Sequence, residues 1–144
     1  MSAGSSKGRL LAPWGVRLTY AAVFVLNVTC ALQFALFPDM SAAAYELSGV
    51  AGETAVRGIG VAFLMWNATY PAVIIAPARF RQLAVVVLVQ QAIGLAGETA
   101  ILLTLPAGHA VLAGSIERFI LFDGVGLVAM LAAFVWMSYA LRPR

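Results

Sequence analysis

Residues 116–141 read IERFILFDGVGLVAMLAAFVWMSYAL, a run that is apolar for most of its length. A helix needs about 20 mostly apolar residues to cross the ~30 Å hydrocarbon core of a bilayer. This run is long enough, and its only charged residues are Glu117, Arg118 and Asp123. We therefore predict that it forms a transmembrane helix.

Three further runs of comparable length and hydropathy precede it, at residues 16–37, 53–76 and 83–105. A proline directly follows each of them, and proline disfavours helical geometry in the residue before it. The sequence thus predicts an all-α fold, an integral membrane four-helix bundle that forms one transmembrane domain over residues 16–141. Residues 1–15 are rich in Ser and Gly, and we expect them to be a flexible cytoplasmic segment.

The composition of the chain fits a lipid environment better than water. Of its 144 residues, 62% are hydrophobic and 10% are charged, whereas a soluble domain usually carries about 25% charged residues. The net charge of +3 comes with no basic patch interleaved with aromatic residues, so we expect no nucleic-acid partner. The expected partners are the lipid bilayer and a lipophilic small molecule.

The cysteine and histidine content restricts the chemistry that the chain can perform. Cys30 is the only cysteine and His109 the only histidine. A lone cysteine excludes an internal disulfide and CxxC thiol exchange, and a lone histidine excludes a His-rich zinc, copper or di-iron site. A carboxylate-only magnesium or calcium site has no supporting pattern. We therefore expect no metal and no cofactor.

Basic residues are distributed asymmetrically among the connections between the predicted spans. The connections 39–52 and 106–115 contain no Lys or Arg. Seven basic residues flank the first span, fill the second connection or close the chain: Lys7, Arg9, Arg17, Arg79, Arg81, Arg142 and Arg144. Because Lys- and Arg-rich loops stay on the cytoplasmic side, we predict a multi-pass protein of the cell membrane with both termini in the cytoplasm.

Every predicted span carries polar groups in the half of the bundle that lies away from the termini. At ~1.5 Å per residue along a helix, Glu98 and Asp123 lie about 10 Å below the outer surface and Gln33 about 6 Å below it, while Glu117 lies at the outer rim. A charged side chain inside a bilayer costs ~2.5–3.5 kcal/mol and normally faces partners in the protein interior. These groups therefore mark a candidate site.

Helical periodicity arranges these side chains in stripes, because successive residues of a helix turn by ~100°. The stripes comprise Glu53, Arg57, Gly60 and Asn67 on the second span, Gln91, Gly94 and Glu98 on the third, and Phe119 and Asp123 on the fourth. The second span thus offers a cation at the depth of the acids on its neighbours. We predict an ion pair between Arg57 and either Asp123 or Glu98.

The outer half holds more acids than bases. Four acidic residues lie there against two arginines, so desolvation and like-charge repulsion should keep a proton on at least one acid near neutral pH. A protonated carboxylic acid beside an ionised carboxylate is what general acid–base chemistry uses. We predict Glu98, Asp123, Glu53 and Arg57 as the catalytic residues. The alternative is that ion pairs and hydrogen bonds only hold the helices together.

Aromatic and amide side chains accompany the acids. Trp66 and Tyr70 lie deeper than an interfacial aromatic belt requires, which indicates a lined cavity. An aromatic wall next to an acid stabilises a cationic intermediate through cation–π attraction. The predicted substrate-binding residues are Gln33, Asn67, Trp66, Tyr70, Gln91, Phe119 and Glu117.

The segment Arg57-Gly58-Ile59-Gly60 follows an acidic first loop. Together with the chain length and the four-span layout, it resembles the DoxX-like group of small bacterial membrane proteins. The resemblance covers most of the chain as layout, while the motif itself is short. Because that group is functionally mixed, the resemblance implies a four-helix bundle and no particular reaction.

These features lead to one hypothesis about function and two alternatives. We expect a cofactor-independent enzyme of the isomerase or terpene-cyclase type, which uses carboxylate acid–base chemistry on a lipophilic substrate such as an isoprenoid-like alkene or epoxide. The first alternative is a small proton-coupled transporter or transporter subunit, which would need a homo-oligomer because one four-helix bundle is small for alternating access. The second is an accessory or assembly subunit without catalysis.

Overall fold

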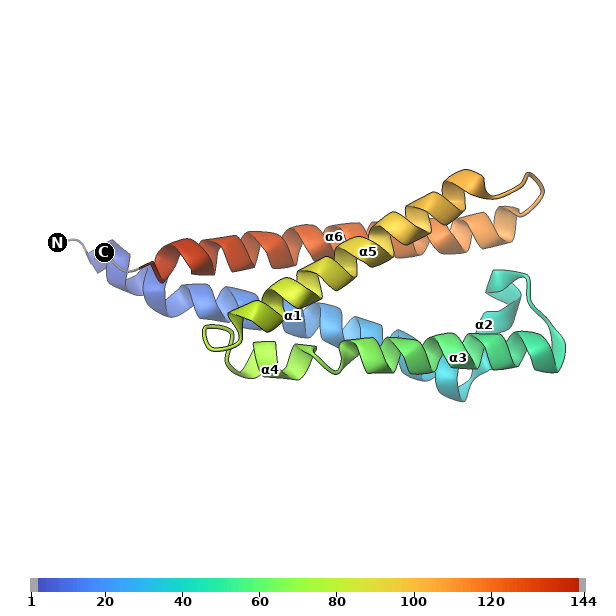
Figure 1. Cartoon of the computed structure of the whole chain (residues 1–144), viewed down its shortest axis with the longest axis horizontal. Helices are drawn as coiled ribbons and strands as arrows, with labels where there is room; N and C mark the ends of the chain where they lie inside the picture. The colour runs from blue at the N-terminus through green and yellow to red at the C-terminus, as the bar shows by residue number, and fades with distance from the viewer. Residues whose placement is uncertain (1–2, 143–144) are drawn as a thin grey trace.

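The computed structural model describes residues 3–142, with side chains from residue 8 onward, and this part of the chain contains helices and no strand (Figure 1). Its elements in chain order are α1 (Ala3–Leu36), α2 (Pro38–Ala42), the 3-10 helix η1 (Ala43–Tyr45), α3 (Gly49–Asn67), α4 (Tyr70–Ile75), α5 (Arg81–Thr104) and α6 (Ala110–Ala140). The predicted all-α fold is confirmed. Residues 3–15 of the predicted N-terminal segment belong to α1.

Within residues 3–142, four helical segments are long and apolar enough to cross a membrane. They cover Gly8–Leu36, Gly49–Ile75, Arg81–Thr104 and Ala110–Ala140, so α3 and α4 together make the second. Each segment begins earlier than the sequence predicts, because hydropathy locates the apolar centre of a span and not the helical turns that extend beyond it. The four-helix layout of the prediction is confirmed.

The three prolines that follow the predicted spans all stand where a long helix ends. Their preceding residues leave helical geometry: Phe37 has φ −130° and ψ 57°, Ala76 has φ −142° and ψ 69°, and Leu105 has φ −67° and ψ 127°. The steric clash between the proline ring and the preceding residue accounts for each of these ends.

A fourth proline breaks the second segment internally. Pro71 lies in the first turn of α4, and the two residues between α3 and α4 form a turn. Proline has no N–H to donate and its ring clashes with the carbonyl of the residue four positions earlier, which here is Asn67. Thr69 Oγ1 donates to the Trp66 carbonyl oxygen at 3.3 Å. The break sets the direction in which Asn67 and Tyr70 enter the bundle.

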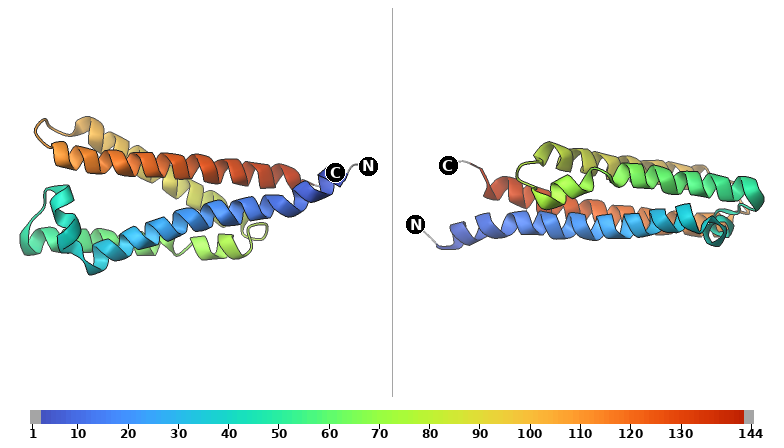
Figure 2. Two further views of the ribbon diagram at one scale, coloured as in Figure 1. Left: turned by 180° about the vertical axis from the view of Figure 1, so that it is seen from behind. Right: turned by 90° about the horizontal axis from the view of Figure 1, so that it is seen from below.

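The molecule has two distinct ends. Both termini lie at the same end as the connection between α4 and α5, which we call the terminal end (Figures 1 and 2). The opposite end, which we call the loop end, carries α2, η1 and the connection between α5 and α6. The arginines that flank the helices, namely Arg9, Arg17, Arg79, Arg81 and Arg142, therefore all belong to the terminal end.

Helix α1 is the centre of the packing, because it contacts α3, α4 and α6, while α5 packs against α4 and α6. Toward the loop end the α5/α6 pair diverges from the α1/α3 pair, and α2 lies between them (Figure 1). The contact between α1 and α3 is close at Gly60, where an added Cβ would lie 2.6 Å from Ala35 N and 2.7 Å from Ala31 O. Only glycine allows this approach.

The interior is packed differently in the two halves. In the terminal half, large side chains such as Tyr20, Tyr70, Met130 and Met137 are fully buried in one hydrophobic cluster. The loop half has a smaller cluster around Phe34 and two cavities, which are described below. The outward faces of the helices remain apolar, with exposed residues such as Leu18, Val25, Leu36, Leu103 and Val128.

Candidate functional site

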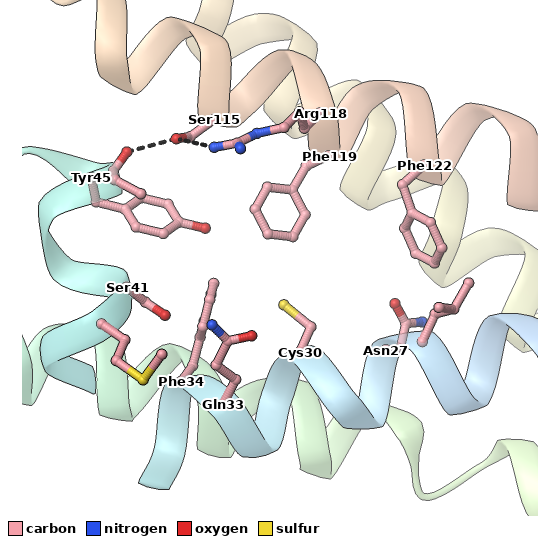
Figure 3. A pocket seen from close by; sticks show the side chains of 13 residues that line it. Asn27, Cys30, Gln33, Phe34, Ser41, Tyr45, Ser115, Arg118, Phe119 and Phe122 are labelled. Carbon is pink, nitrogen blue, oxygen red and sulfur yellow. Dashed lines mark hydrogen bonds between the residues drawn. The ribbon is translucent and has the colours of Figure 1, made fainter. Parts of the chain in front are cut away.

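A cavity of about 440 Å³ lies in the loop half between α1, the α2–η1 segment and α6 (Figure 3). Its volume is within the ~300–1,000 Å³ of small-molecule pockets. We call it the large cavity. Its lining residues are Leu26, Asn27, Cys30, Gln33, Phe34, Met40, Ser41, Ala44, Tyr45, Ser115, Arg118, Phe119 and Phe122.

The apolar wall of the large cavity is aromatic. The Phe119 ring centroid lies 6.3 Å from that of Phe34 and 6.5 Å from that of Tyr45, and the first pair meets edge to face. Tyr45 and Phe34 also meet edge to face, at 5.6 Å. These geometries are favourable for aromatic pairs, so helices α1 and α6 and the η1 segment are held around the cavity by ring contacts.

The end of the large cavity nearest the loops is polar. Ser115 Oγ donates to the Ala44 carbonyl oxygen at 2.7 Å, which ties α6 to η1, and it accepts a hydrogen bond from Arg118 Nη2 at 3.1 Å. Burial raises the pKa of the Tyr45 hydroxyl above its ordinary value, the nearby Cys30 and Glu98 raise it further, and Arg118 lowers it. Tyr45 therefore presents a neutral hydroxyl, which points into the cavity (Figure 3).

A second cavity, of about 30 Å³, lies deeper between all four long helices. We call it the acid cavity, because Glu98 and Asp123 both line it. The remaining lining residues are Asn27, Phe63, Trp66, Asn67, Gln91 and Phe119. Asn27 and Phe119 line both cavities, so they form the partition between the aromatic space and the two carboxyl groups.

A hydrogen-bonded chain fixes Asp123 in the acid cavity. Gln91 Nε2 donates to Asp123 Oδ1 at 2.7 Å, and the Tyr70 hydroxyl donates to Gln91 Oε1 at 3.3 Å. Gln91 is 2% exposed and Tyr70 is fully buried, so both orient Asp123 from the packed interior. A Cβ added to Gly94 would lie 3.0 Å from Asp123 Oδ2, and the small residue therefore leaves room for the carboxylate.

Glu98 is held much less firmly than Asp123. Its Oε2 atom and the Oδ1 atom of Asn67 are buried and have no hydrogen-bond donor among the described residues. A buried acceptor without a donor costs ~1–3 kcal/mol. A proton on Glu98, or a water that donates to both oxygens, would satisfy them, and a cavity of about 30 Å³ has room for one water.

The structure brings together most of the predicted site residues. Glu98, Asp123, Asn67, Trp66, Gln91 and Phe119 line the acid cavity. Tyr70 reaches that cavity through its hydrogen bond to Gln91, and Gln33 lines the large cavity. Glu53, Arg57 and Glu117 line neither of the two cavities.

The predicted ion pair of Arg57 is wrong. Arg57 is exposed, and no carboxylate oxygen lies within 4.0 Å of its guanidinium among residues 3–142. Helix α3 turns Gly52, Val56 and Gly60 inward instead. The predicted stripe covered a wide arc of the helix surface. Toward the loop end α3 diverges from α5 and α6, and there the side of the stripe with Gly60 faces the interior while Arg57 faces outward.

Several lining residues were missed by the sequence analysis. Asn27 and Cys30 lie at helical spacing on α1 and line the large cavity together with Phe34, so the same stripe argument applied to the first span would have found these two residues. Tyr45 and Ser41 had no such signal. They reach the cavity because the segment between α1 and α3 folds back at the loop end (Figure 1), which periodicity does not encode.

A polar contact joins the two connections at the loop end. His109 Nδ1 lies 2.5 Å from Glu46 Oε2, and the backbone N–H of Leu112 donates to Glu46 Oε1 at 3.3 Å. The hydrogen bond to His109 is the main reason why the pKa of Glu46 lies below its ordinary value, and the Leu112 bond acts in the same direction. Glu46 has φ 55°, a left-handed conformation that reverses the chain here.

No cluster of typical metal ligands is evident in the described part of the chain. Among residues 3–142 there is no group of three or more His, Cys, Asp or Glu side chains placed to hold a metal ion. The acidic side chains of the acid cavity are Glu98 and Asp123, which lie next to the aromatic rings of Phe63, Trp66 and Phe119.

Comparisons with known proteins assign neither a family nor a function to the chain. No protein-family model matches the chain, and no curated protein or solved structure matches it either. The resemblance to the DoxX-like group therefore stays a prediction.

Proposed function

We propose that this chain is a four-span membrane enzyme that moves protons within a lipophilic substrate, with both termini on the cytoplasmic side. Two observations support the membrane location and direction: the four helical segments are apolar on their outward faces, and the arginines that flank the helices gather at the terminal end. The acid cavity then lies in the outer half of the bilayer, next to the large cavity, and substrate would reach the acids by displacing the Asn27 and Phe119 side chains between the two cavities.

The observation that carries the proposal is the pairing of two carboxyl groups in one small cavity that no cation lines. Two adjacent carboxylates repel each other, and removing both from water is costly. The pair is therefore most stable when one of the two groups carries a proton. That state provides a general acid and a general base in a cavity that aromatic rings also line.

The two acids have different surroundings and hence different roles. Gln91 donates to Asp123, and a donor of this kind favours the ionised form, so Asp123 is the base. Glu98 has a buried oxygen without a donor in the described chain, so it carries the proton and is the acid. The hydrogen bond from Gln91 keeps Asp123 ionised, so no arginine is needed for that purpose. Arg57, which the sequence predicted as a catalytic residue, therefore has no part in the proposed reaction.

A double-bond isomerisation illustrates the proposed reaction. The Glu98 O–H adds its proton to one carbon of a C=C bond, and the neighbouring carbon becomes cationic. The Asp123 carboxylate then removes a proton from an adjacent carbon, and that C–H electron pair forms the new double bond. Glu98 is left ionised and Asp123 protonated, and transfer of that proton back to Glu98 through the acid cavity restores the starting state. No oxidant or reductant is consumed.

The aromatic residues around the acids suit a cationic intermediate. Phe63 meets Trp66 edge to face at 6.4 Å and Phe119 at 6.5 Å, and all three rings line the acid cavity. Ring faces attract a cation by ~0.5–2 kcal/mol each, and more strongly where water is excluded.

The packing of the terminal half favours an enzyme over a transporter. Alternating access requires a route to the cytoplasmic side, but that half is filled by fully buried side chains such as Tyr20, Tyr70, Met130 and Met137. The Tyr20 hydroxyl also ties α1 to the Ala84 carbonyl oxygen of α5 at 3.1 Å. A site that is accessible from one side suits a reaction or binding better than transport.

The test uses deuterium as a record of proton transfer. The purified protein in lipid nanodiscs is incubated in D₂O with geraniol, farnesol, their terminal epoxides and the monophosphates of the two alcohols, and carbon-bound deuterium is measured by mass spectrometry. Wild type should label at least one probe. The Glu98→Gln and Asp123→Asn variants should lose ~10²–10⁴-fold of the rate. The matched control is Glu117→Gln, which changes an exposed acid outside both cavities and should keep the full rate.

Thermal stability measured on the same samples separates chemistry from structure. If the acids only hold the helices together, the amide variants should keep their labelling rate, and the Ala variants should unfold at lower temperature. Full labelling activity in both amide variants would end the acid–base proposal.

A further inference from the structure

The large cavity contains a cation that the proposed reaction does not use. Arg118 lines it from α6, and no carboxylate oxygen lies within 4.0 Å of its guanidinium among the described residues. Arg118 is exposed, and among the described residues its one hydrogen bond to a side chain goes to Ser115, whereas a guanidinium has five N–H donors. Most of its capacity to bind an anion is therefore still available.

The surroundings of Arg118 suit a small anionic group. Ser41 and Tyr45 direct their hydroxyl groups into the same space, as Figure 3 shows. Ser41 is 4% exposed, so its hydroxyl is placed by packing. Ser115 accepts a hydrogen bond from Arg118 and donates one to the Ala44 carbonyl oxygen of η1. The Arg118 side chain is thereby held next to η1 at the polar end of the cavity. A guanidinium with hydroxyl groups nearby is well suited to carboxylate or phosphate oxygens.

The other end of the cavity is mostly apolar, with the Asn27 amide as its polar group. Along α1 the lining runs from Phe34 to Leu26, which is about 12 Å at ~1.5 Å per residue. Leu26 and Phe122 close the far end, next to the partition formed by Asn27 and Phe119. A molecule whose charged group sits at Arg118 would thus lay its apolar part against the rings and toward the acid cavity.

We propose that the large cavity binds an anionic amphiphile, a molecule with one carboxylate or phosphate group at Arg118 and a single apolar chain along α1. This inference rests on the proposed function, because it identifies the class of substrate that Glu98 and Asp123 act on. The volume of about 440 Å³ is near the lower end of the range for ligand pockets, and it suits one chain better than two.

Cys30 provides a native reporter of occupancy. It is the only cysteine of the chain, it is half-buried, and its thiol points into the large cavity (Figure 3). A bound amphiphile should slow its alkylation by N-ethylmaleimide. Dodecyl phosphate, dodecanoate and the neutral dodecanol are titrated against protein in phosphatidylcholine nanodiscs, and the concentration that gives half-protection of Cys30 is read from intact-protein mass spectra.

Wild type should be protected by the two anionic probes at about 10- to 100-fold lower concentration than by dodecanol. Arg118→Gln should remove that preference, and Arg118→Lys should keep part of it. Arg57→Gln is the matched control, because Arg57 is an exposed arginine of the same outer half that lines neither cavity. It should behave as wild type.

Further arms identify the source of the anion. Inorganic phosphate and acetate alone should not protect Cys30, because they lack the apolar chain. Nanodiscs with phosphatidylglycerol should compete with dodecyl phosphate only if the anionic group belongs to a bilayer lipid. Native mass spectrometry of the complex gives a second measurement of binding that does not depend on thiol reactivity.

Two results would overturn the inference: equal half-protection by dodecyl phosphate and dodecanol in wild type, or an unchanged preference in Arg118→Gln protein that remains folded by circular dichroism. The Glu98→Gln variant distinguishes this failure from failure of the proposed reaction. It should bind dodecyl phosphate as wild type does while it loses deuterium labelling. Labelling without anion preference would refute the inference alone, and anion preference without labelling would refute the reaction alone.

Discussion

Gln91 on α5 donates a 2.7 Å hydrogen bond from Nε2 to Oδ1 of Asp123 on α6, and this is the one side-chain hydrogen bond between these two helices in the described chain. It joins a buried amide near the middle of α5 to a carboxyl group of α6 in the acid cavity. The same amide accepts from the Tyr70 hydroxyl, so the bond also connects Asp123 to α4.

Replacing Gln91 should therefore affect both stability and the acid pair. In Gln91→Leu the Tyr70 hydroxyl and the Asp123 carboxyl group lose their partner, and each buried polar group left without one costs ~1–3 kcal/mol. The midpoint of thermal unfolding in nanodiscs should fall. Gln82→Leu is the matched control, since Gln82 is an exposed amide on the same helix. Equal midpoints for the two variants would contradict a role of Gln91 in holding the site.

The contact between α1 and α3 can be tested with two glycines of one helix. A Cβ at Gly60 would lie 2.6 Å from Ala35 N, a backbone atom that has no freedom to move aside, whereas a Cβ at Gly58 would meet nothing within 4 Å. Gly60→Ala should destabilise the bundle by ~1–3 kcal/mol. Gly58→Ala should stabilise it by up to ~1 kcal/mol through its helix propensity. Thermal unfolding of both variants measures the difference, and a shift of the same sign in both would contradict the close approach.

The contact between Glu46 and His109 predicts a dependence on pH. The pKa of Glu46 in the folded state is lowered, mainly by the hydrogen bond to His109, so the contact stabilises the fold above the ordinary pKa of a glutamate. That stabilisation is lost as the pH falls through the lowered value. In His109→Ala the pKa of Glu46 should return toward its ordinary range, as followed by ¹³C NMR of the Glu46 carboxyl group.

A control and a contrary result complete this experiment. Glu117→Gln changes another exposed acid of the loop end that is not among the contacts of Glu46, and it should leave the Glu46 titration unchanged. If the titration of Glu46 is the same with and without the His109 ring, the two loops are not coupled through this pair.

The direction of insertion can be tested by labelling from one side. In a Cys30→Ser background, Arg79→Cys lies in the connection between α4 and α5 and His109→Cys lies at the start of α6, and both positions are exposed. A membrane-impermeant maleimide should label position 109 in intact cells and position 79 only after lysis, because Arg-rich connections stay in the cytoplasm. The reverse pattern would refute the proposed topology.

The sequence by itself determined the helices and part of the site. The helices follow from the apolar runs and from the prolines at 38, 77 and 106, which are local features of the chain. Helical hydrogen bonds connect residues four apart, and a proline interrupts them wherever it stands. The stripe of Gln91 and Glu98 was also correct, and both line the acid cavity with Asp123. Along α5 the periodicity alone was sufficient, since the face of that helix toward α6 coincides with its polar face.

Only the tertiary structure decided which side chains meet across helices. Arg57 shares the predicted stripe of α3 with Asn67, but α3 packs on α1 through Gly60, and this contact fixes the rotation of the helix so that Arg57 faces outward. Tyr45 enters the large cavity from a segment outside the spans. The rotation of a helix and the path of a loop depend on which surfaces fit together, and those contacts join residues far apart in the chain, where no local periodicity records them.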